Sequence, residues 1–257
     1  MNILLKMNTA HQLLELQQTL YVSKNPTRRW LHCARRDWIF DAIQRHGTAH
    51  PGRALEIGPG SGLYLPLLAN RFQEVIAADI EDAYLNHANT LVAAHPNLRP
   101  IVDDITRSRL PERSFDLILC TEVVEHIADS ARAIAEMHRL LKPGGFLILS
   151  TPQRYSPLEL TAKIAFLPGV VDVVRMIYRE PVLETGHINL LTTAQVTAQL
   201  AQPGFRIREH HKSGVYLPLL AEFAGKAGLH LEQWLEPRLR NSPLDWLLWT
   251  QYFVAEA

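Results

Sequence analysis

The stretch 54-ALEIGPGSGLYLPLLA-69 places a glycine-rich loop between two apolar runs. Gly58, Gly60 and Gly62 allow the backbone to turn sharply and let a ligand approach main-chain atoms that a Cβ would shield. The run before the loop suits a buried strand, because it has no polar side. The stretch therefore predicts a strand followed by a tight loop that holds a ligand close to the backbone.

Outward from this loop, short apolar runs alternate with helical patterns from about residue 53 to 151, which is typical of a parallel sheet with crossover helices. A helix is expected after Asp129, and another over TTAQVTAQLAQ with Thr192 or Thr193 as its cap. The expected strands are RALEI, EVIAAD, RPIVDD, FDLILCT, GFLILST, FRIREHH and WTQYFVAEA. We therefore expect an α/β, Rossmann-like fold with a seven-stranded, mostly parallel sheet and helices on both faces.

The 257 residues fit a single domain with insertions. Residues 1–50 are expected to form a helical N-terminal cap, and residues 53–151 the ligand-binding core. Residues 152–191 and 212–246 do not fit the alternating rhythm and are long for simple connections. Since long loops in compact domains are usually functional, we expect these two stretches to be substrate lids.

The composition of the chain limits the classes of molecule that it is expected to bind. Twenty-six basic residues balance twenty-six acidic ones, so no overall field attracts nucleic acid. The two cysteines, Cys33 and Cys120, and the lack of a secretory pattern favour a cytoplasmic protein. The apolar segment 164–177 is too short to span a bilayer, so integral membrane association is not expected. A small-molecule partner remains, and the oligomeric state is open.

The loop does not match the common phosphate-binding patterns. A dinucleotide fingerprint requires a glycine at position 63, where this chain has Leu63. A phosphate-binding P-loop would continue with Gly-Lys-Ser/Thr, which is absent from this sequence after the loop.

Acidic residues around the loop indicate the ligand instead. Glu56, Asp79 and Asp104 lie at or after the carboxyl ends of the first three expected strands, where ligands bind in open parallel sheets. Three carboxylates would repel a pyrophosphate, but they suit a ligand with ribose hydroxyls, an amino group and a positive centre. S-adenosylmethionine has all three features.

The motifs around these residues resemble those of the class I S-adenosylmethionine-dependent methyltransferases, including the ubiquinone-pathway O-methyltransferases. The resemblance covers about residues 53–210 and includes ALEIGPGSG, VIAADI, VDDI, LPERSFDLILCTEVVEHI and LLKPGGFLILSTP in the expected order. It implies that Glu56 and the three glycines hold the methionine end of the cofactor.

The same resemblance implies roles around the nucleoside. Asp79 would accept from both ribose hydroxyls, with Ile80 beside the adenine. Asp104 would accept from the exocyclic amine, with Ile105 next to it, and we count Thr121 with the cofactor residues. The implied activity is methyl transfer from S-adenosylmethionine to a small or medium acceptor, with oxygen favoured as the nucleophile.

Candidates for the chemistry follow the fourth strand. If the turn there is helical, Glu122, Glu125 and His126 lie on one side of it. His126 has the reference pKa of a general base. The arrangement also resembles the metal-dependent ubiquinone-pathway enzymes, so a divalent metal is left open without being assigned. The alternative is that the acids bind backbone amides while His126 braces the loop.

His187, at the end of the first lid, is a second catalytic candidate, or else it pins the lid to the sheet. The basic run from Lys24 to Arg36 either meets the cofactor or pairs with acids such as Asp37. The leucine- and tryptophan-rich second lid suits a lipophilic acceptor, a partner subunit or brief membrane contact.

Two other functions stay open from the sequence. The chain could bind S-adenosylmethionine as the non-catalytic partner of another subunit, or it could use the cofactor in a metal-assisted O-methylation of a catechol-like quinone precursor. A nicotinamide enzyme is a further rival, although Leu63 argues against it.

Overall fold

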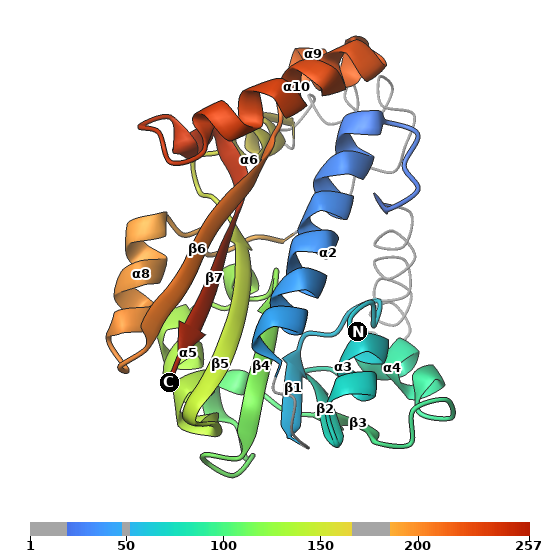
Figure 1. Cartoon of the computed structure of the whole chain (residues 1–257), viewed down its shortest axis with the longest axis vertical. Coiled ribbons are helices and arrows are strands. Elements are labelled where there is room, and N and C mark those ends of the chain that lie inside the picture. Colours follow the sequence, from blue (N-terminus) through green and yellow to red (C-terminus); the bar gives the residue numbers. More distant parts are fainter. Residues whose placement is uncertain (1–19, 48–51, 166–185) are drawn as a thin grey trace, which may run out of the picture.

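The computed structural model describes residues 20–47, 52–165 and 186–257. They form one sheet of seven strands in the order β3-β2-β1-β4-β5-β7-β6 (Figure 1). The strands are β1 (Arg53–Ile57), β2 (Glu74–Asp79), β3 (Leu98–Val102), β4 (Phe115–Thr121), β5 (Leu141–Pro152), β6 (Arg206–Val215) and β7 (Leu248–Glu256). The expected seven-stranded Rossmann-like sheet is confirmed.

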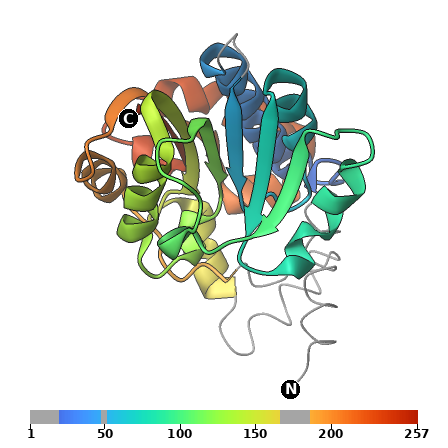
Figure 2. The ribbon, with the colours of Figure 1, turned by 90° about the horizontal axis from the view of Figure 1, so that it is seen from below.

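Helices cover both faces of the sheet, which is visible end-on in Figure 2. They are α2 (Pro26–His46), α3 (Leu65–Arg71), α4 (Asn86–Leu91), α5 (Ser130–Leu140), α6 (Pro157–Ala165), α8 (Thr193–Ala201), α9 (Pro218–Phe223) and α10 (Gly225–Leu239). Short 3-10 turns occupy Asp82–Leu85, Ile105–Arg107, Val124–His126 and Asp245–Leu247.

The strand order creates the binding edge. β1 pairs in parallel with β2 on one side and with β4 on the other, so the chain reverses direction across the sheet between β1 and β4. Ligands of open α/β sheets bind outside the carboxyl ends of the strands at such a switch point. Only β7 runs antiparallel, between β5 and β6. The glycine loop therefore leaves β1 at the place where the fold is expected to bind a ligand.

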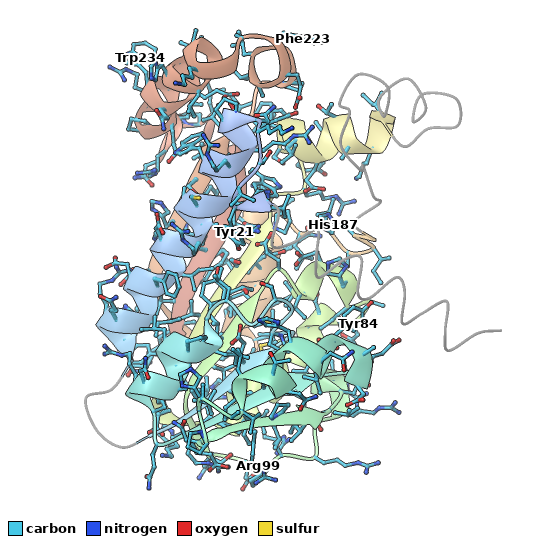
Figure 3. All side chains as sticks on the ribbon, turned by 90° about the vertical axis from the view of Figure 1, so that its right-hand side faces the viewer. Tyr21, Tyr84, Arg99, His187, Phe223 and Trp234 are labelled. Atoms are coloured by element: carbon cyan, nitrogen blue, oxygen red, sulfur yellow. The ribbon has the colours of Figure 1, made fainter. Side chains whose placement is uncertain are left out.

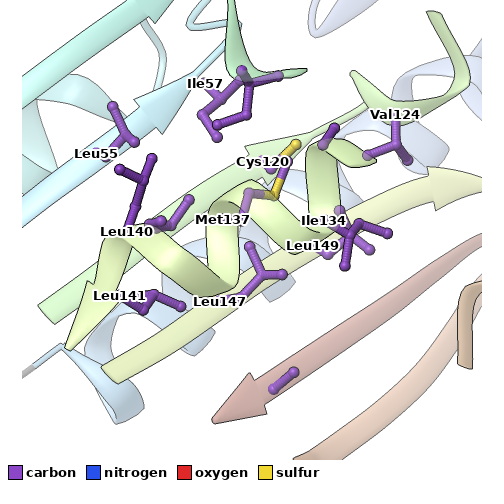
Figure 4. Packing of buried hydrophobic residues seen from close by; sticks show 14 of the residues in the cluster. Leu55, Ile57, Cys120, Val124, Ile134, Met137, Leu140, Leu141, Leu147 and Leu149 are labelled. Atoms are coloured by element: carbon purple, nitrogen blue, oxygen red, sulfur yellow. The ribbon is translucent and has the colours of Figure 1, made fainter. Parts of the chain in front are cut away.

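Two apolar layers hold the sheet. On one face, α5 contributes Ile134, Met137 and Leu140, which pack with strand residues such as Leu147 and Leu149 (Figure 4). On the other face, Ile39 and Ile43 of α2 pack with residues of α3 and of the strands. Because neighbouring residues of a strand point to opposite faces, strands buried on both sides must be apolar throughout, as the sequence indicates.

Helix caps fall where the sequence places them. The side chain of Asp129 accepts a hydrogen bond from the backbone N–H of Arg132 at 3.1 Å, and α5 follows. Thr192 and Gln195 form a capping box at the start of α8. Both expected helices are confirmed.

The two stretches predicted as lids differ in how much of them is described. The first contains the end of β5, α6 and residues 186–191, while residues 166–185 lie outside the described residues. Residues 1–19 and 48–50 of the predicted N-terminal cap also lie outside them. The second contains the end of β6, then α9 and α10, which lie across one end of the molecule (Figure 1). Their role as substrate lids stays a prediction. Among the described helices, none has the length and apolar character needed to cross a membrane.

Candidate active site

The glycine loop has the backbone conformation that its sequence predicts. Gly58, Gly60 and Gly62 have φ angles of +64°, +50° and +67°, in the left-handed region that side chains disfavour. A Cβ on Gly58 would lie 2.5 Å from Cγ2 of Val123. The N–H of Gly58 donates to the carbonyl of Ala78 at 2.9 Å, which ties the loop to β2.

A cavity of about 110 Å³ lies against this loop. Its lining comes from the loop, from the ends of β1 and β4, and from the start of the chain's described part: Leu20, Tyr21, Arg35, Glu56, Gly58, Pro59, Gly60, Ser61, Leu63, Tyr64, Thr121 and Glu122. A second hollow of about 320 Å³ borders the outer side of the loop at Gly62 and His87. The structure thus brings Glu56, Gly58, Gly60 and Thr121 together around one space, and Gly62 beside it.

Glu56 is a buried acid in this cavity. Its side chain is 2% exposed, and its Oε2 atom has no hydrogen-bond partner among the described residues. Burial raises the pKa of Glu56 to about 8. A buried acceptor without a donor suits a ligand that brings a positive charge or an N–H group.

Asp79 ends β2 at the same edge of the sheet. Burial raises the pKa of its carboxyl group, although the backbone N–H of Glu81 donates to Oδ1 at 3.3 Å. Ile80 follows and is 62% exposed. The contacts of Asp79 and Ile80 with a nucleoside stay predictions.

Asp104 lies after β3, and its carboxylate accepts more hydrogen bonds from neighbouring residues than the sequence suggests. Its Oδ1 accepts from the side-chain hydroxyl of Thr106 at 2.7 Å and from the backbone N–H of the same residue at 3.0 Å. Its Oδ2 accepts from Nε of Arg107 at 2.9 Å. The Thr106 hydroxyl is the largest cause that lowers the pKa of Asp104. Ile105, its neighbour, is buried. Both oxygens of the Asp104 carboxylate already accept hydrogen bonds, so a ligand donor would have to share an oxygen with one of these donors.

Glu122 points away from the other two candidates that follow β4. It has a φ angle of +55°, and only a 3-10 turn, Val124–His126, follows it. Its carboxylate accepts from Nη1 of Arg35 at 2.5 Å and from the hydroxyl of Ser150 at 2.9 Å. The helical turn on which the shared side of Glu122, Glu125 and His126 depended does not include Glu122, because its left-handed backbone turns the side chain toward α2.

Arg35 is the cavity residue that this ion pair positions. Its side chain is 11% exposed, lies over the ring of Trp249 at 5.2 Å, and donates through Nη2 to Nδ1 of His32 at 3.1 Å. Burial alone would lower the pKa of Arg35, but the charge of Glu122, together with nearby tyrosines, outweighs burial and raises the pKa. Within the same basic run, Arg36 pairs with Asp37 at the surface and Arg28 pairs with Glu222 of α9.

Glu125, His126 and His187 form a second cluster. Their ligand-type atoms all lie within 4.8 Å of one another. Glu125 is fully buried, its Oε2 accepts from the hydroxyl of Thr151 at 3.0 Å, and its Oε1 has no partner among the described residues. Burial, and next the charge of Glu122, raise the pKa of Glu125. Since Ser150 and Thr151 are consecutive strand residues, Glu122 and Glu125 are held on opposite faces of β5.

The two histidines of this cluster lie face to edge, with ring centroids 5.1 Å apart. Nδ1 of His126 lies 3.2 Å from the carbonyl of Gly186, and its pKa is lowered, first by burial and then by His187. Figure 3 shows His187 about midway along the molecule.

Two residues that the sequence analysis missed orient His187. Nδ1 of His187 lies 3.1 Å from Oε2 of Glu159 in α6, and the other oxygen of Glu159 accepts from Nε1 of Trp249 at 3.0 Å. Glu159 is 6% exposed. An acid among the apolar residues of a lid was the one signal available, because its partners are distant in sequence.

A family model for a methyltransferase domain matches residues 55–149, the segment that contains the glycine loop, Asp79, Asp104 and the turn after β4. Residues 55–149 are therefore a methyltransferase domain, and the relatives that the chain matches are S-adenosylmethionine-dependent methyltransferases. A probable S-adenosylmethionine-dependent methyltransferase of Mycolicibacterium smegmatis is 29% identical over 196 residues, which are 74% of this chain and 66% of that protein. A ubiquinone biosynthesis O-methyltransferase of Pseudomonas aeruginosa is 34% identical over 131 residues, half of this chain and 54% of that protein.

Solved structures agree on the fold of the chain. A putative sarcosine dimethylglycine methyltransferase from Galdieria sulphuraria superimposes with a TM-score of 0.60, covering 89% of this chain and 87% of that one, at 13% identity. The match with the Mycolicibacterium protein spans just under two thirds of that relative, and the match with the Pseudomonas enzyme about half of it. The fold and the cofactor class of the methyltransferase domain are thus assigned, and the methyl acceptor is not.

Proposed function

We propose that this methyltransferase moves the methyl group of S-adenosylmethionine to an oxygen atom of a small or medium acceptor. The cavity at the β1–β4 switch point carries the proposal, since it joins a glycine loop of left-handed backbone to the unpartnered buried carboxylate of Glu56. The oxygen acceptor is supported by the similarity to a ubiquinone biosynthesis O-methyltransferase.

The residues present fit this cofactor. Glu56 would accept from the amino group of the methionine moiety, and Gly58 and Gly60 leave main-chain atoms open to it. Asp79 would accept from the ribose hydroxyls. When bound, S-adenosylmethionine supplies a methyl group already activated on a sulfonium, so the protein mainly has to align the acceptor and exclude water.

A hydroxyl acceptor must also lose a proton, and the His126–His187 pair is the proposed base. Glu159 would accept from Nδ1–H of His187 and leave the Nε2 lone pair available, as an orienting carboxylate does in other acid–base sites. The lowered pKa of His126 keeps its imidazole neutral at neutral pH. The nearby His187 ring contributes to this lowering.

We predict that His187→Ala lowers kcat by about a hundredfold or more, because a positioned general base contributes on that scale. The measurement is the initial rate of S-adenosylhomocysteine formation, with cofactor affinity as the control. Glu159→Gln keeps an acceptor for Trp249 but removes the carboxylate, so it should lower kcat less and move the acid limb of the pH profile. Full turnover in the His187 variant would remove this residue from the mechanism.

We further predict that cofactor affinity depends on pH through Glu56. With a pKa of about 8 in the free protein, Glu56 is mostly protonated at pH 7. A cationic ligand favours the carboxylate, so binding releases a proton and affinity rises between about pH 6 and pH 8, then levels off. Calorimetry across this range should show a smaller rise for Glu56→Gln. Titration of the ligand itself affects wild type and Glu56→Gln equally. If affinity rose with pH by the same slope in both proteins, the role of Glu56 would be contradicted.

The Glu125, His126 and His187 cluster supports a second candidate, metal-assisted O-methylation of a catechol-like acceptor. One carboxylate and two imidazoles are a donor set that divalent metals accept. Turnover that is lost on treatment with a chelator and regained with a divalent salt would favour this candidate. Turnover that survives chelation would favour the metal-free base.

A further inference from the structure

The helices α9 and α10 place their charges in an unusual way. All three of their acidic residues, Glu222, Glu232 and Glu236, turn inward, with Glu232 fully buried and Glu236 8% exposed. Glu232 accepts from the hydroxyl of Thr27 at 2.6 Å and from the N–H of Leu217 at 2.8 Å. A surface helix normally turns such residues toward water. The inward hydrogen bonds leave the outer side without their negative charge.

Large apolar side chains occupy that outer side instead. Phe223 is 71% exposed, Trp234 is 54% exposed and Leu231 is 41% exposed. Figure 3 shows Phe223 and Trp234 at the same end of the molecule, with Arg99 at the opposite end. Leu231 and Trp234 are three residues apart on α10, so they share a face. Solvent exposure of several large apolar residues at one end of the molecule indicates an interaction surface.

Cations lie among these apolar side chains. Lys226 and Arg238 are exposed on α10, and the guanidinium carbon of Arg238 lies 3.8 Å from the ring centroid of Trp234. The start of α2 adds exposed Lys24, next to Asn25, whose Nδ2 donates to the carbonyl of Ala221 in α9. We call Phe223, Lys226, Leu231, Trp234 and Arg238 the α9–α10 outer face.

We propose that the α9–α10 outer face docks the protein onto an anionic lipid surface. An amphipathic helix that exposes Trp, Phe and Leu beside basic residues inserts the apolar side chains at the headgroup boundary while the cations attract anionic lipid. Charge complementarity favours this occupant over a second copy of the chain, because pairing two such faces would bring cations against cations. With the acids turned inward, no negative charge on the two helices opposes the approach.

The test uses the full chain and vesicles of phosphatidylcholine, with and without about a third of phosphatidylglycerol. Wild-type protein should sediment with the anionic vesicles, far less with the neutral ones, and less as salt is raised. Lys226→Glu should weaken vesicle binding about tenfold, and the double variant Phe223→Ser/Trp234→Ser at least as much. Arg99→Glu makes the same charge reversal at the opposite end, where its side chain is 71% exposed, and should bind as wild type does.

Several results would overturn the proposal. Wild-type protein that ignores anionic vesicles, or binds neutral ones equally well, excludes an anionic lipid surface. Equal loss in Arg99→Glu would mean that only overall charge matters. Sedimentation velocity without lipid provides the last check, since a dimer that Phe223→Ser/Trp234→Ser converts to a monomer would assign the face to a second copy. Unchanged S-adenosylmethionine affinity of Lys226→Glu shows that this variant is folded, so its vesicle result stands by itself.

Discussion

Replacing Asp79 by alanine is expected to lower the affinity for S-adenosylmethionine by about a hundredfold or more. The carboxylate ends β2 at the binding edge of the sheet, where it would accept from both ribose hydroxyls. A hydrogen bond to a charged group contributes about 1.5–3 kcal/mol, and the variant loses two of them. Calorimetric titration of the purified variant with S-adenosylmethionine measures the change.

Asp82→Ala is the matched control for this prediction. Asp82 is an exposed carboxylate three residues later, in the 3-10 turn Asp82–Leu85. It should bind the cofactor nearly as wild type does. Similar affinities for Asp79→Ala and wild type would show that the ribose is held elsewhere.

Glu122→Gln is expected to destabilise the protein by about 3 kcal/mol, because it leaves the charge of Arg35 without compensation in a nearly buried position. Glutamine has nearly the same size as glutamate and must adopt the same left-handed backbone at this position. The substitution therefore changes only the charge of the side chain. Chemical denaturation of the cofactor-free protein provides the measurement.

The ion-pair origin of that loss can be checked in the same assay. Arg35→Met in the Glu122→Gln background should recover a large part of the lost stability, since removing both charges of a buried pair is often nearly neutral. If the double variant is less stable than Glu122→Gln by the full effect of Arg35→Met alone, the two side chains are energetically independent and the explanation fails.

Much of the fold was predictable because its signals are local. The glycines at 58, 60 and 62 have the positive φ angles that their loop requires, and the caps at Asp129 and Thr192 begin α5 and α8 as expected. Strands buried on both faces are continuous apolar runs, so they could be recognised without knowledge of their neighbours.

The organisation of the site depends on distant pairs, which one sequence does not reveal. Glu122 and Arg35 are 87 residues apart, and Trp249 and Glu159 are 90 residues apart. The sequence grouped Glu122 with Glu125 and His126 on condition that a helical turn follows β4. The structure has a left-handed residue there instead, which pairs Glu122 with the basic run and leaves Glu125 and His126 with His187.

The most direct test of the central claim is a calorimetric titration of wild-type protein with S-adenosylmethionine and, separately, with NADH. We expect one S-adenosylmethionine to bind per chain, displaced by S-adenosylhomocysteine, and no heat from NADH, because Leu63 interrupts the dinucleotide fingerprint while Glu56 and Asp79 favour a cationic nucleoside. Binding of NADH without any response to S-adenosylmethionine would contradict the account.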